Sequence, residues 1–149
     1  MEEKRLRNRL ETTFPARSEN EALARSVAAA FAAQADPTIE ELTEIRTAVS
    51  EAVSNAVIHA YPGDEGDVNM ELRLYEDGTL VISVEDQGVG ILDVAQAREP
   101  LYTTGTDGER SGMGFTVMES FTDRLEVHSE PEKGTRVLMV KRLDVSYGH

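Results

Sequence analysis

A glutamate and an asparagine four residues apart, Glu51 and Asn55, are side chains that could act together on one substrate. On a helix, residues at this spacing lie on the same face. A carboxylate can act as a general base, and an amide oxygen is a suitable ligand for Mg²⁺, a hard cation. Alone the pair is a weak indication, because a solvated polar face of an amphipathic helix has the same composition. Ile58 projects among these polar positions, which suggests that another part of the chain covers that side.

A second group of residues, Asp86-Gln87-Gly88-Val89-Gly90, follows a stretch in which apolar and polar residues alternate. Strict alternation over residues 80–86 puts the Asp86 carboxylate on the apolar face of that strand. A carboxylate buried there needs hydrogen-bond donors, and the amino group of adenine is a suitable one. Gly88 and Gly90 would let the backbone pass close to a flat ring. The alternative is a strand-ending turn in which the aspartate caps its own backbone.

Two further glycine motifs lie downstream. The segment Arg110-Ser111-Gly112-Met113-Gly114 leads into a short helix predicted to begin after Gly112, where backbone N–H groups and the helix dipole favour an anion. Arg110 and Ser111 could donate to the same phosphates. Gly134-Thr135 opens the last predicted strand and is by itself an ordinary turn. No G-x-x-x-x-G-K-[ST] sequence is present, so these glycines do not form a Walker-type loop.

Two helices are predicted in the first half of the chain. Ser18 with Glu21 predicts a capping box that opens a helix to about residue 34, and Thr38 with Glu41 predicts a second box that opens a helix to about residue 61. The second helix would carry Glu51 and Asn55. The first shows an apolar stripe made of Leu23, Val27, Ala28 and Phe31.

Alternating residues predict the strands of a sheet. Asp77-Gly78 between two alternating runs indicates a hairpin. The first strand would hold Leu6, Leu10 and Phe14 on one side, and residues 87–112 are expected to form a mobile lid. The strands are expected at residues 6–14, 68–76, 80–86, 124–129 and 135–143. The predicted fold is α/β in the sense of a two-layer α+β sandwich, with helices on one face of a mixed, mostly antiparallel sheet, in a single domain over residues 1–149.

Composition narrows the partners. The net charge of −13, from 15 basic and 28 acidic residues, would repel a phosphate backbone and disfavours direct binding of nucleic acid. The absence of cysteine excludes disulfides and thiolate metal sites. The charged start of the chain does not resemble a signal peptide, and no stretch of sequence is apolar enough to span a bilayer. We therefore expect a cytoplasmic protein that binds no membrane.

The order of the motifs E-x-x-x-N, D-x-G-x-G, G-x-G and G-T resembles the Bergerat-type nucleotide-binding fold of gyrase, heat-shock protein 90, histidine kinases and mismatch-repair ATPases. This resemblance spans about residues 40–140. The runs PARSENEALAR, DPTIEELTEIRTAVSEAVSNAVIHAY, EPLYTTG and ERSGMGFTVMESF resemble more closely the sporulation anti-sigma F factors. Members of that family are small, dimeric serine kinases that bind a sigma factor and phosphorylate its anti-anti-sigma factor. The stress-response anti-sigma kinases are the nearest relatives.

The resemblance implies a role for individual residues. It implies that Glu51 is the general base, that Asn55 is a ligand of Mg²⁺, and that Asp86 reads the adenine of ATP with help from Thr135. It places Arg25 at a position that contacts both the sigma factor and the anti-anti-sigma factor.

Glycines and lid residues complete the implied site. Gly88 and Gly90 would shape the nucleotide pocket, and the segment 110–114 would hold the phosphates through Gly112 and Gly114, beside Arg110, Ser111 and Met113. Thr103, Thr104 and Arg110 would belong to the lid. Gly105 departs from the related lids, which often carry a lysine there.

Three other functions fit parts of this pattern. A detached ATP-binding half of a histidine kinase would need a phosphoacceptor histidine on a preceding helix, and none of His59, His128 and His149 precedes the motifs. A module that sequesters a sigma factor without phosphotransfer is disfavoured by the intact Glu51–Asn55 pair, but a fold alone does not establish activity. An ATP hydrolase that works as a clamp would usually need a transducer domain.

Overall fold

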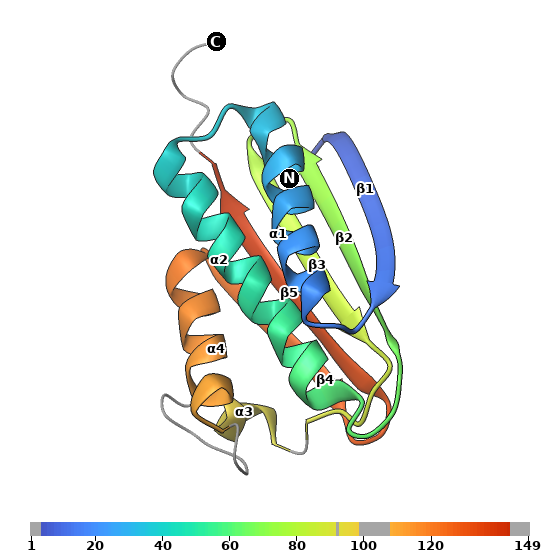
Figure 1. Cartoon of the computed structure of the whole chain (residues 1–149). Helices are drawn as coiled ribbons and strands as arrows, with labels where there is room; N and C mark the ends of the chain where they lie inside the picture. The colour runs from blue at the N-terminus through green and yellow to red at the C-terminus, as the bar shows by residue number, and fades with distance from the viewer. Residues whose placement is uncertain (1–3, 92, 99–107, 144–149) are drawn as a thin grey trace.

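A computed structural model describes residues 4–91, 93–98 and 108–143, with the backbone alone for residues 108–113. The helices are α1 (Glu19–Ala32), α2 (Ile39–Asn55), α3 (Val94–Ala97) and α4 (Gly108–Phe121). A 3₁₀ turn (Ala33–Ala35) follows α1, and a π-helical turn (Ala56–Ala60) continues α2. The strands are β1 (Leu6–Pro15), β2 (Asp67–Tyr75), β3 (Thr79–Asp86), β4 (Arg124–Glu130) and β5 (Gly134–Arg142), as Figure 1 shows.

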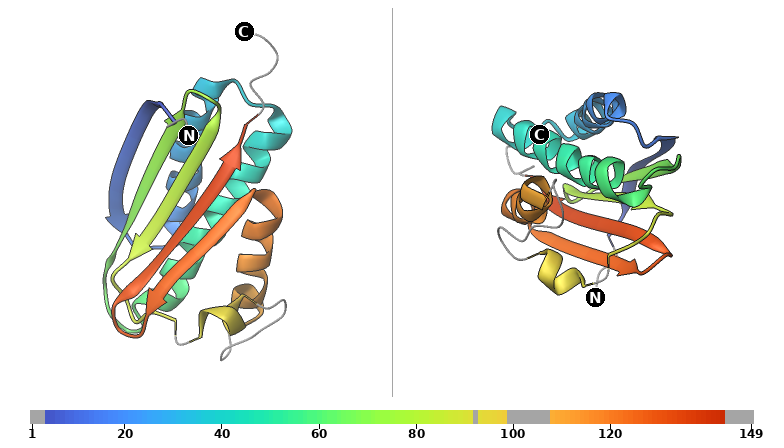
Figure 2. Two further views of the ribbon diagram at one scale, coloured as in Figure 1. Left: turned by 180° about the vertical axis from the view of Figure 1, so that it is seen from behind. Right: turned by 60° about the horizontal axis from the view of Figure 1, so that its bottom comes forward.

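The strands form one sheet in the order β1-β2-β3-β5-β4, and α1, α2 and α4 cover one of its faces (Figure 2). This confirms the predicted two-layer arrangement, and each strand ends within one residue of its predicted boundary. All neighbouring pairs of described strands are antiparallel, so the described sheet contains no parallel pair of the kind a mixed sheet would have. None of the helices in the described part of the chain has the length and apolar composition needed to cross a membrane.

The β2–β3 hairpin fixes the position of Asp86. Gly78 turns the chain with φ of +89°, and its N–H donates to the carbonyl of Tyr75 at 3.0 Å. The register that follows pairs Val68 with Asp86 at the opposite end of the hairpin. The Asp77-Gly78 turn was predicted, and the structure confirms it.

The helix α2 is anchored on the sheet by its apolar face. Ile45, Val49 and Val53 are at most 1% exposed and lie in one core with the inward residues of the strands. Burial of each such side chain contributes about 1.5–3 kcal/mol. These contacts fix the orientation of α2 about its own axis. Glu51 and Asn55 therefore lie on the side of the helix that faces α4.

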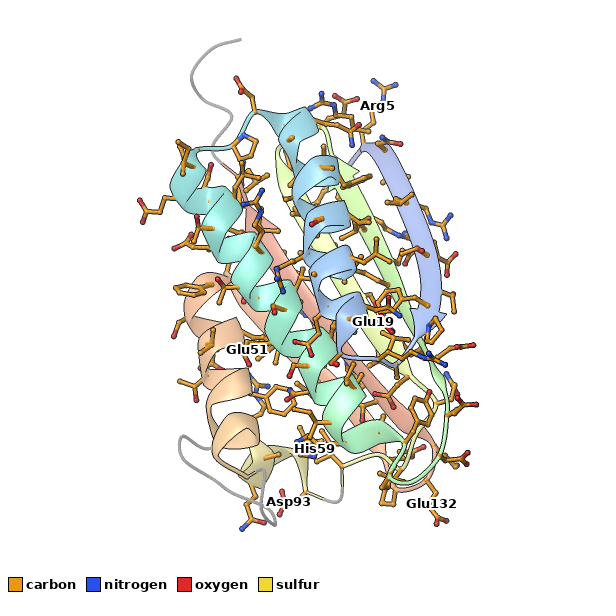
Figure 3. All side chains as sticks on the ribbon, viewed as in Figure 1. Arg5, Glu19, Glu51, His59, Asp93 and Glu132 are labelled. Carbon is orange, nitrogen blue, oxygen red and sulfur yellow. The ribbon has the colours of Figure 1, made fainter. Side chains whose placement is uncertain are left out.

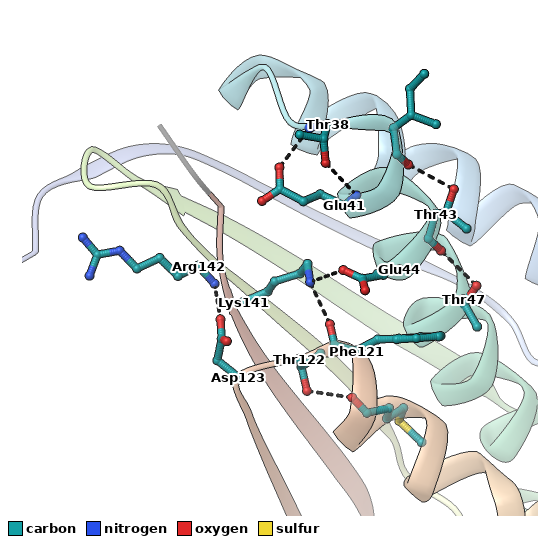
Figure 4. Close-up of polar contacts among 12 residues, drawn as sticks. Thr38, Glu41, Thr43, Glu44, Thr47, Phe121, Thr122, Asp123, Lys141 and Arg142 are labelled. Atoms are coloured by element: carbon teal, nitrogen blue, oxygen red, sulfur yellow. Dashed lines mark hydrogen bonds and ion pairs between the residues drawn. The ribbon is translucent and has the colours of Figure 1, made fainter. Parts of the chain in front are cut away.

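The two predicted capping boxes have different outcomes. Thr38 accepts from the N–H of Glu41 at 3.0 Å, and the Glu41 carboxylate accepts from the N–H of Thr38 at 2.9 Å, which confirms the second box (Figure 4). The first box is wrong, because Ser18 already has helical angles (φ −58°, ψ −34°) and its side chain makes no capping bond. A cap residue must instead be extended for its side chain to reach the first turn.

The apolar stripe of α1 is also displaced from its prediction. Leu23 is 50% exposed, whereas Ala28 and Phe31 are buried as expected, together with Ala24 and Ala32. The first helix therefore packs through small residues next to α2, which lets the two helices approach closely.

The start of β1 departs from simple alternation. The register shifts between Leu6 and Asn8, so Leu6 pairs with Tyr75 on the outer face while Leu10 pairs with Leu72 on the helical face. Such a bulge moves a side chain to the other face of a strand. Leu6 and Leu10 are 45% and 38% exposed on this edge strand, and of the three expected inward residues Phe14 alone is buried.

A lysine joins three elements at the end of the molecule away from Asp86. Lys141 on β5 donates to the Glu44 carboxylate of α2 at 2.8 Å and to the Phe121 carbonyl at the end of α4 at 2.9 Å (Figure 4). Cations near a helix C-terminus are favourable because they satisfy its unpaired carbonyls. This contact fixes the end of α4 against α2.

Candidate functional site

A pocket of about 410 Å³ opens between α2, the loop after β3 and the helices α3 and α4. Most of its lining is apolar, and a few polar side chains converge on it, as in sites for small ligands. The apolar lining includes Ala52, Ala56, Ala60, Val84, Ile91, Phe115 and Val137, and the polar lining Asn55, His59, Asp86, Asp93, Gln96 and Thr135. Figure 3 shows Glu51 and His59 along one helix, with Asp93 near its lower end.

Asp86 lines the pocket and is 7% exposed, which confirms its predicted inward direction. Its Oδ1 accepts from the N–H of Gly88 at 2.9 Å. Burial raises the pKa of Asp86, and the hydrogen bonds from the N–H groups of Gly88 and Thr135 oppose this rise. The carboxylate therefore both caps its own loop and lines the pocket. The strand-ending turn and the inward-facing carboxylate, given as alternatives from the sequence, are both present.

The glycines of the D-x-G-x-G motif pack against the protein's own backbone. A Cβ on Gly88 would lie 2.1 Å from the carbonyl oxygen of Ala60, and one on Gly90 would lie 2.1 Å from that of Glu130. Gly90 also has φ of +77°, which disfavours a side chain. Of the two glycines, Gly90 lines the pocket and Gly88 does not. Close packing of the chain on itself therefore excludes a side chain at both glycines.

Residues 87–91 are held by hydrogen bonds rather than forming part of a loose lid. The N–H of Gln87 donates to the Tyr61 hydroxyl and that of Val89 to the Ala60 carbonyl, both at 2.8 Å. The Val89 carbonyl accepts from the N–H of Glu132 at 2.6 Å. These bonds join the end of the π-helical turn to the β4–β5 hairpin and so form a fixed wall of the pocket.

Glu51 and Asn55 meet Gly114 of α4. A Cβ built on Gly114 would lie 3.2 Å from Asn55 Oδ1 and 3.4 Å from Glu51 Oε2, so the helix packs closely on both polar groups. The prediction that something covers this side is confirmed. Asn55 Nδ2 is buried and has no hydrogen-bond partner among the described residues. An unpaired amide N–H can donate to a phosphate oxygen of a bound nucleotide, and the oxygen of the same amide is a suitable hard ligand for Mg²⁺.

The helix α4 begins at Gly108, earlier than predicted. Gly112 is its fifth residue and Gly114 its seventh, so neither supplies the unpaired N–H groups of the first turn. The prediction that these glycines open the helix is therefore wrong. Arg110, Ser111 and Met113 lie on the first turns of α4, and their side chains lie outside the described part of the structure.

The remaining predicted residues either lie outside the described part of the chain or do not line the pocket. Thr103, Thr104 and Gly105 lie outside the described residues. Arg25 lies on α1 and does not line the pocket. It was expected to be exposed and is instead half-buried, since the buried stripe of α1 is rotated toward Ala28 and Ala29, one turn beyond it.

Several lining residues were not predicted. His59 follows Asn55 at helical spacing, which is the one signal that could have placed it on the same face. Ile91 and Phe115 follow glycine motifs, but nothing in their sequence context distinguishes them from ordinary core residues. Ser129 was also missed, although it contacts both the loop after β3 and Thr135.

The family of histidine kinase-like ATPase domains matches residues 14–141 of the chain. The anti-sigma F factor of Clostridium perfringens strain 13 is 56% identical over 138 residues, which is 92% of this chain and 98% of that protein. That of Pasteuria penetrans is 55% identical over 143 residues, 94% of each protein. That of Geobacillus kaustophilus is 52% identical over 138 residues, 93% of this chain and 94% of the relative.

Solved structures share the fold. The RsbU and RsbW domains of a Mycobacterium tuberculosis protein match with a TM-score of 0.66 and 20% identity, over 92% of this chain and 32% of that chain. The mycobacterial sensor histidine kinase MprB matches with a TM-score of 0.55 and 21% identity, over 68% of this chain and 72% of that one. At these identities the likeness concerns the arrangement of helices and strands.

Proposed function

The chain belongs to the anti-sigma F factor family and carries a histidine kinase-like ATPase domain, and from this premise we propose that it inhibits a sigma factor of RNA polymerase and uses ATP to phosphorylate the anti-anti-sigma factor on serine. The observation that carries the proposal is the placement of two chemistries beside one pocket. Asp86 and Asn55 both line it, and Asn55 lies one helical turn from Glu51.

The adenine of ATP would lie beside Asp86. The apolar lining offers a surface for a flat ring, and the Asp86 carboxylate offers an acceptor for the adenine amino group. The backbone bonds to Gly88 and Thr135 hold that carboxylate before any ligand arrives. Thr135 lies across the strand pair from Asp86 and would support the same contact.

The phosphates would extend along α2 toward Asn55 and the start of α4. Bound Mg²⁺ supplies the charge that neutralises the phosphates during transfer. Asn55 would present its amide oxygen to that ion, and Glu51 would accept the proton of the attacking serine hydroxyl. Arg110, Ser111, Met113 and the lid residues Thr103 and Thr104 belong to this proposal through the family resemblance.

The protein partners would bind away from the pocket. Arg25 on α1 is the proposed contact for both the sigma factor and the anti-anti-sigma factor. Its guanidinium forms no ion pair within the described residues, so it has a charge to offer to an acidic group. We further propose that the protein is a homodimer, that it acts in the cytoplasm on the sporulation sigma factor, and that it binds no nucleic acid directly, in keeping with its net charge of −13.

A reconstitution with purified partners tests this function. The chain, ATP and Mg²⁺ are incubated with a candidate anti-anti-sigma factor, and phosphoserine on the partner is sought by mass spectrometry. Retention of the sigma factor on the immobilised chain is measured in parallel. Sigma binding without phosphoserine would favour the alternative of a non-catalytic sequestering module. Phosphorylation of stress-response partners alone would favour a stress-response anti-sigma kinase.

A further inference from the structure

The short helix α3 forms one wall of the pocket. Gln96 and Ala97 line the pocket, and Ala97 is partly buried against the core. The helix α4, with which α3 is in contact, contributes Phe115, which is 5% exposed, to the same lining. The width of the pocket on this side therefore depends on how α3 is held against α4.

An ion pair joins these two helices outside the pocket. The Arg98 guanidinium, at the C-terminal end of α3, donates to the Glu119 carboxylate of α4 at 2.6 Å. Neither residue lines the pocket, but each is coupled to one that does. Arg98 follows Ala97 directly, and Glu119 lies one helical turn after Phe115 and therefore on the same face of α4. The ion pair thus restrains the separation of Ala97 and Phe115.

The helix α3 needs such a restraint because it has only four residues, too few for a helix that is stable alone. Its start is held by Asp93, whose Oδ1 accepts from the N–H of Gln96 at 3.0 Å, and by the bond from the N–H of Ile91 to Ser129 Oγ at 2.7 Å. Its other end carries the ion pair. The side chains of Arg98 and Glu119 are 30% and 65% exposed, so dissolved salt can screen their attraction.

We propose that the Arg98–Glu119 ion pair holds α3 against α4 and thereby slows the release of nucleotide from the pocket. Both are positioning residues, since neither lines the pocket. The inference rests on the proposed binding of ATP and goes beyond it by naming what sets the lifetime of the complex. Without the ion pair, the end of α3 can move away from Phe115 and open a path for the nucleotide to leave.

Charge reversal tests this role. The release of ADP that carries a fluorescent N-methylanthraniloyl group is followed by stopped flow, with excess ADP as the competitor. Arg98→Glu and Glu119→Arg each place like charges at the contact, so each should release the nucleotide about threefold faster or more. The double variant restores opposite charges and should return to within about twofold of the wild-type rate.

Lys4→Glu is the control for the change of net charge. It breaks the exposed ion pair of Lys4 with Asp77, at the end of the β2–β3 hairpin away from Asp86, and should keep the wild-type rate of release.

The response to salt adds a readout that a merely structural role would not move. Salt screens attraction and repulsion alike. A variant with both Arg98→Gln and Glu119→Gln lacks the two charges and reports the salt response of the phosphates alone. Relative to that variant, added salt should speed release from the wild type and slow it from either single reversal.

Three results would contradict the inference or the function beneath it. Wild-type release rates in both single reversals would overturn the role of the ion pair. Faster release in Arg98→Glu alone, without recovery in the double variant, would also overturn it, because Arg98 would then act on the nucleotide without Glu119. Wild-type protein that binds no nucleotide would overturn the proposed function as well, whereas normal binding with unchanged rates refutes the inference alone.

Discussion

The Tyr61 hydroxyl accepts a hydrogen bond from the N–H of Gln87 at 2.8 Å and donates one to the Asp67 carbonyl at the same distance. One side chain thus connects the end of the π-helical turn to the start of β2 and to the residue after Asp86. The ring packs against Gly66, where a Cβ would lie 2.2 Å from it, and burial raises the pKa of Tyr61. Tyr61 therefore supports the wall of the pocket from behind.

Removal of this hydroxyl tests its contribution. Tyr61→Phe keeps the ring but leaves the N–H of Gln87 and the Asp67 carbonyl without their shared partner. We expect a loss of about 1–3 kcal/mol in the free energy of unfolding and several-fold weaker binding of ADP. Chemical denaturation and calorimetry measure the two effects. Tyr75→Phe, on the outer face of β2, is the control and should change either quantity little; equal effects in both variants would contradict the role of Tyr61.

The pH dependence of nucleotide binding should report the Asp86 carboxylate. Its pKa is raised above the ordinary value of 3.8 because it is buried. Binding of ADP should therefore weaken on acidification while an exposed aspartate would still be ionised. Asp86→Asn should bind ADP poorly and should lack this weakening. The phosphates of ADP titrate with either protein, so subtracting the variant's calorimetric pH profile from that of the wild type leaves the contribution of Asp86.

The raised pKa of Asp86 affects the stability of the free protein in the opposite direction: acidification weakens the binding of ADP but increases the contribution of Asp86 to stability. The folded state binds a proton at Asp86 more tightly than the unfolded state does, so this group contributes its stability fully below about pH 3.8 and loses it as the pH rises through the raised pKa. The free energy of unfolding of the wild type, relative to that of Asp86→Asn, should therefore fall as the pH rises. A relative stability that rises with pH would contradict the assignment.

The sequence predicted those features that local patterns determine. Alternation over residues 80–86 correctly gave the inward direction of Asp86, and Asp77-Gly78 gave the hairpin. Ser18 and Thr38 present the same cap pattern, yet Thr38 alone caps its helix. The difference is tertiary, since the N–H of Ala16 is bonded to Gly66 and the chain enters α1 already turned.

The site was predicted less completely than the fold because its supports come from distant segments. Gly88 packs against Ala60, and Thr135 contacts Ser129, and neither relationship has a local sequence signal. The position of Gly114 against Asn55 follows from the packing of α4 on α2. A motif predicts which residues meet a ligand, whereas long-range packing determines how they are held.

Glu51 and Asn55 should have separable effects. Glu51→Gln removes the proton acceptor, so phosphotransfer should fall about 10²–10⁴-fold while binding of ATP stays near the wild-type value. Asn55→Ala should instead weaken the Mg²⁺-dependent part of nucleotide affinity. Radiolabel transfer and calorimetry with and without Mg²⁺ distinguish the two, and a normal transfer rate in Glu51→Gln would eliminate it as the base.

Gly114→Ala tests the close packing of α4 on this pair. The new Cβ would lie 3.2 Å from Asn55 Oδ1, so the amide must shift by a few tenths of an ångström. Alanine favours a helix by about 1 kcal/mol over glycine, which offsets the crowding. We therefore expect nearly unchanged thermal stability with at least about tenfold slower phosphotransfer. If stability and transfer both stay at wild-type values, the packing has no influence on the catalytic pair.

Arg25→Glu tests the partner surface on α1. The side chain is half-buried and has no ion pair within the described residues, so substitution in the free protein breaks no described salt bridge. In a complex, an interfacial arginine can contribute about 2 kcal/mol or more, and reversal of its charge should weaken sigma binding by more than about tenfold. ATP binding should be unchanged, because Arg25 does not line the pocket.

Arg46→Glu, an exposed arginine on α2, reproduces the change of charge and should retain sigma binding. Pull-down of the sigma factor and calorimetry with ATP on the same preparations decide the matter: undiminished sigma binding in Arg25→Glu would move the partner surface elsewhere on the domain, and loss of ATP binding would point to a disturbed fold.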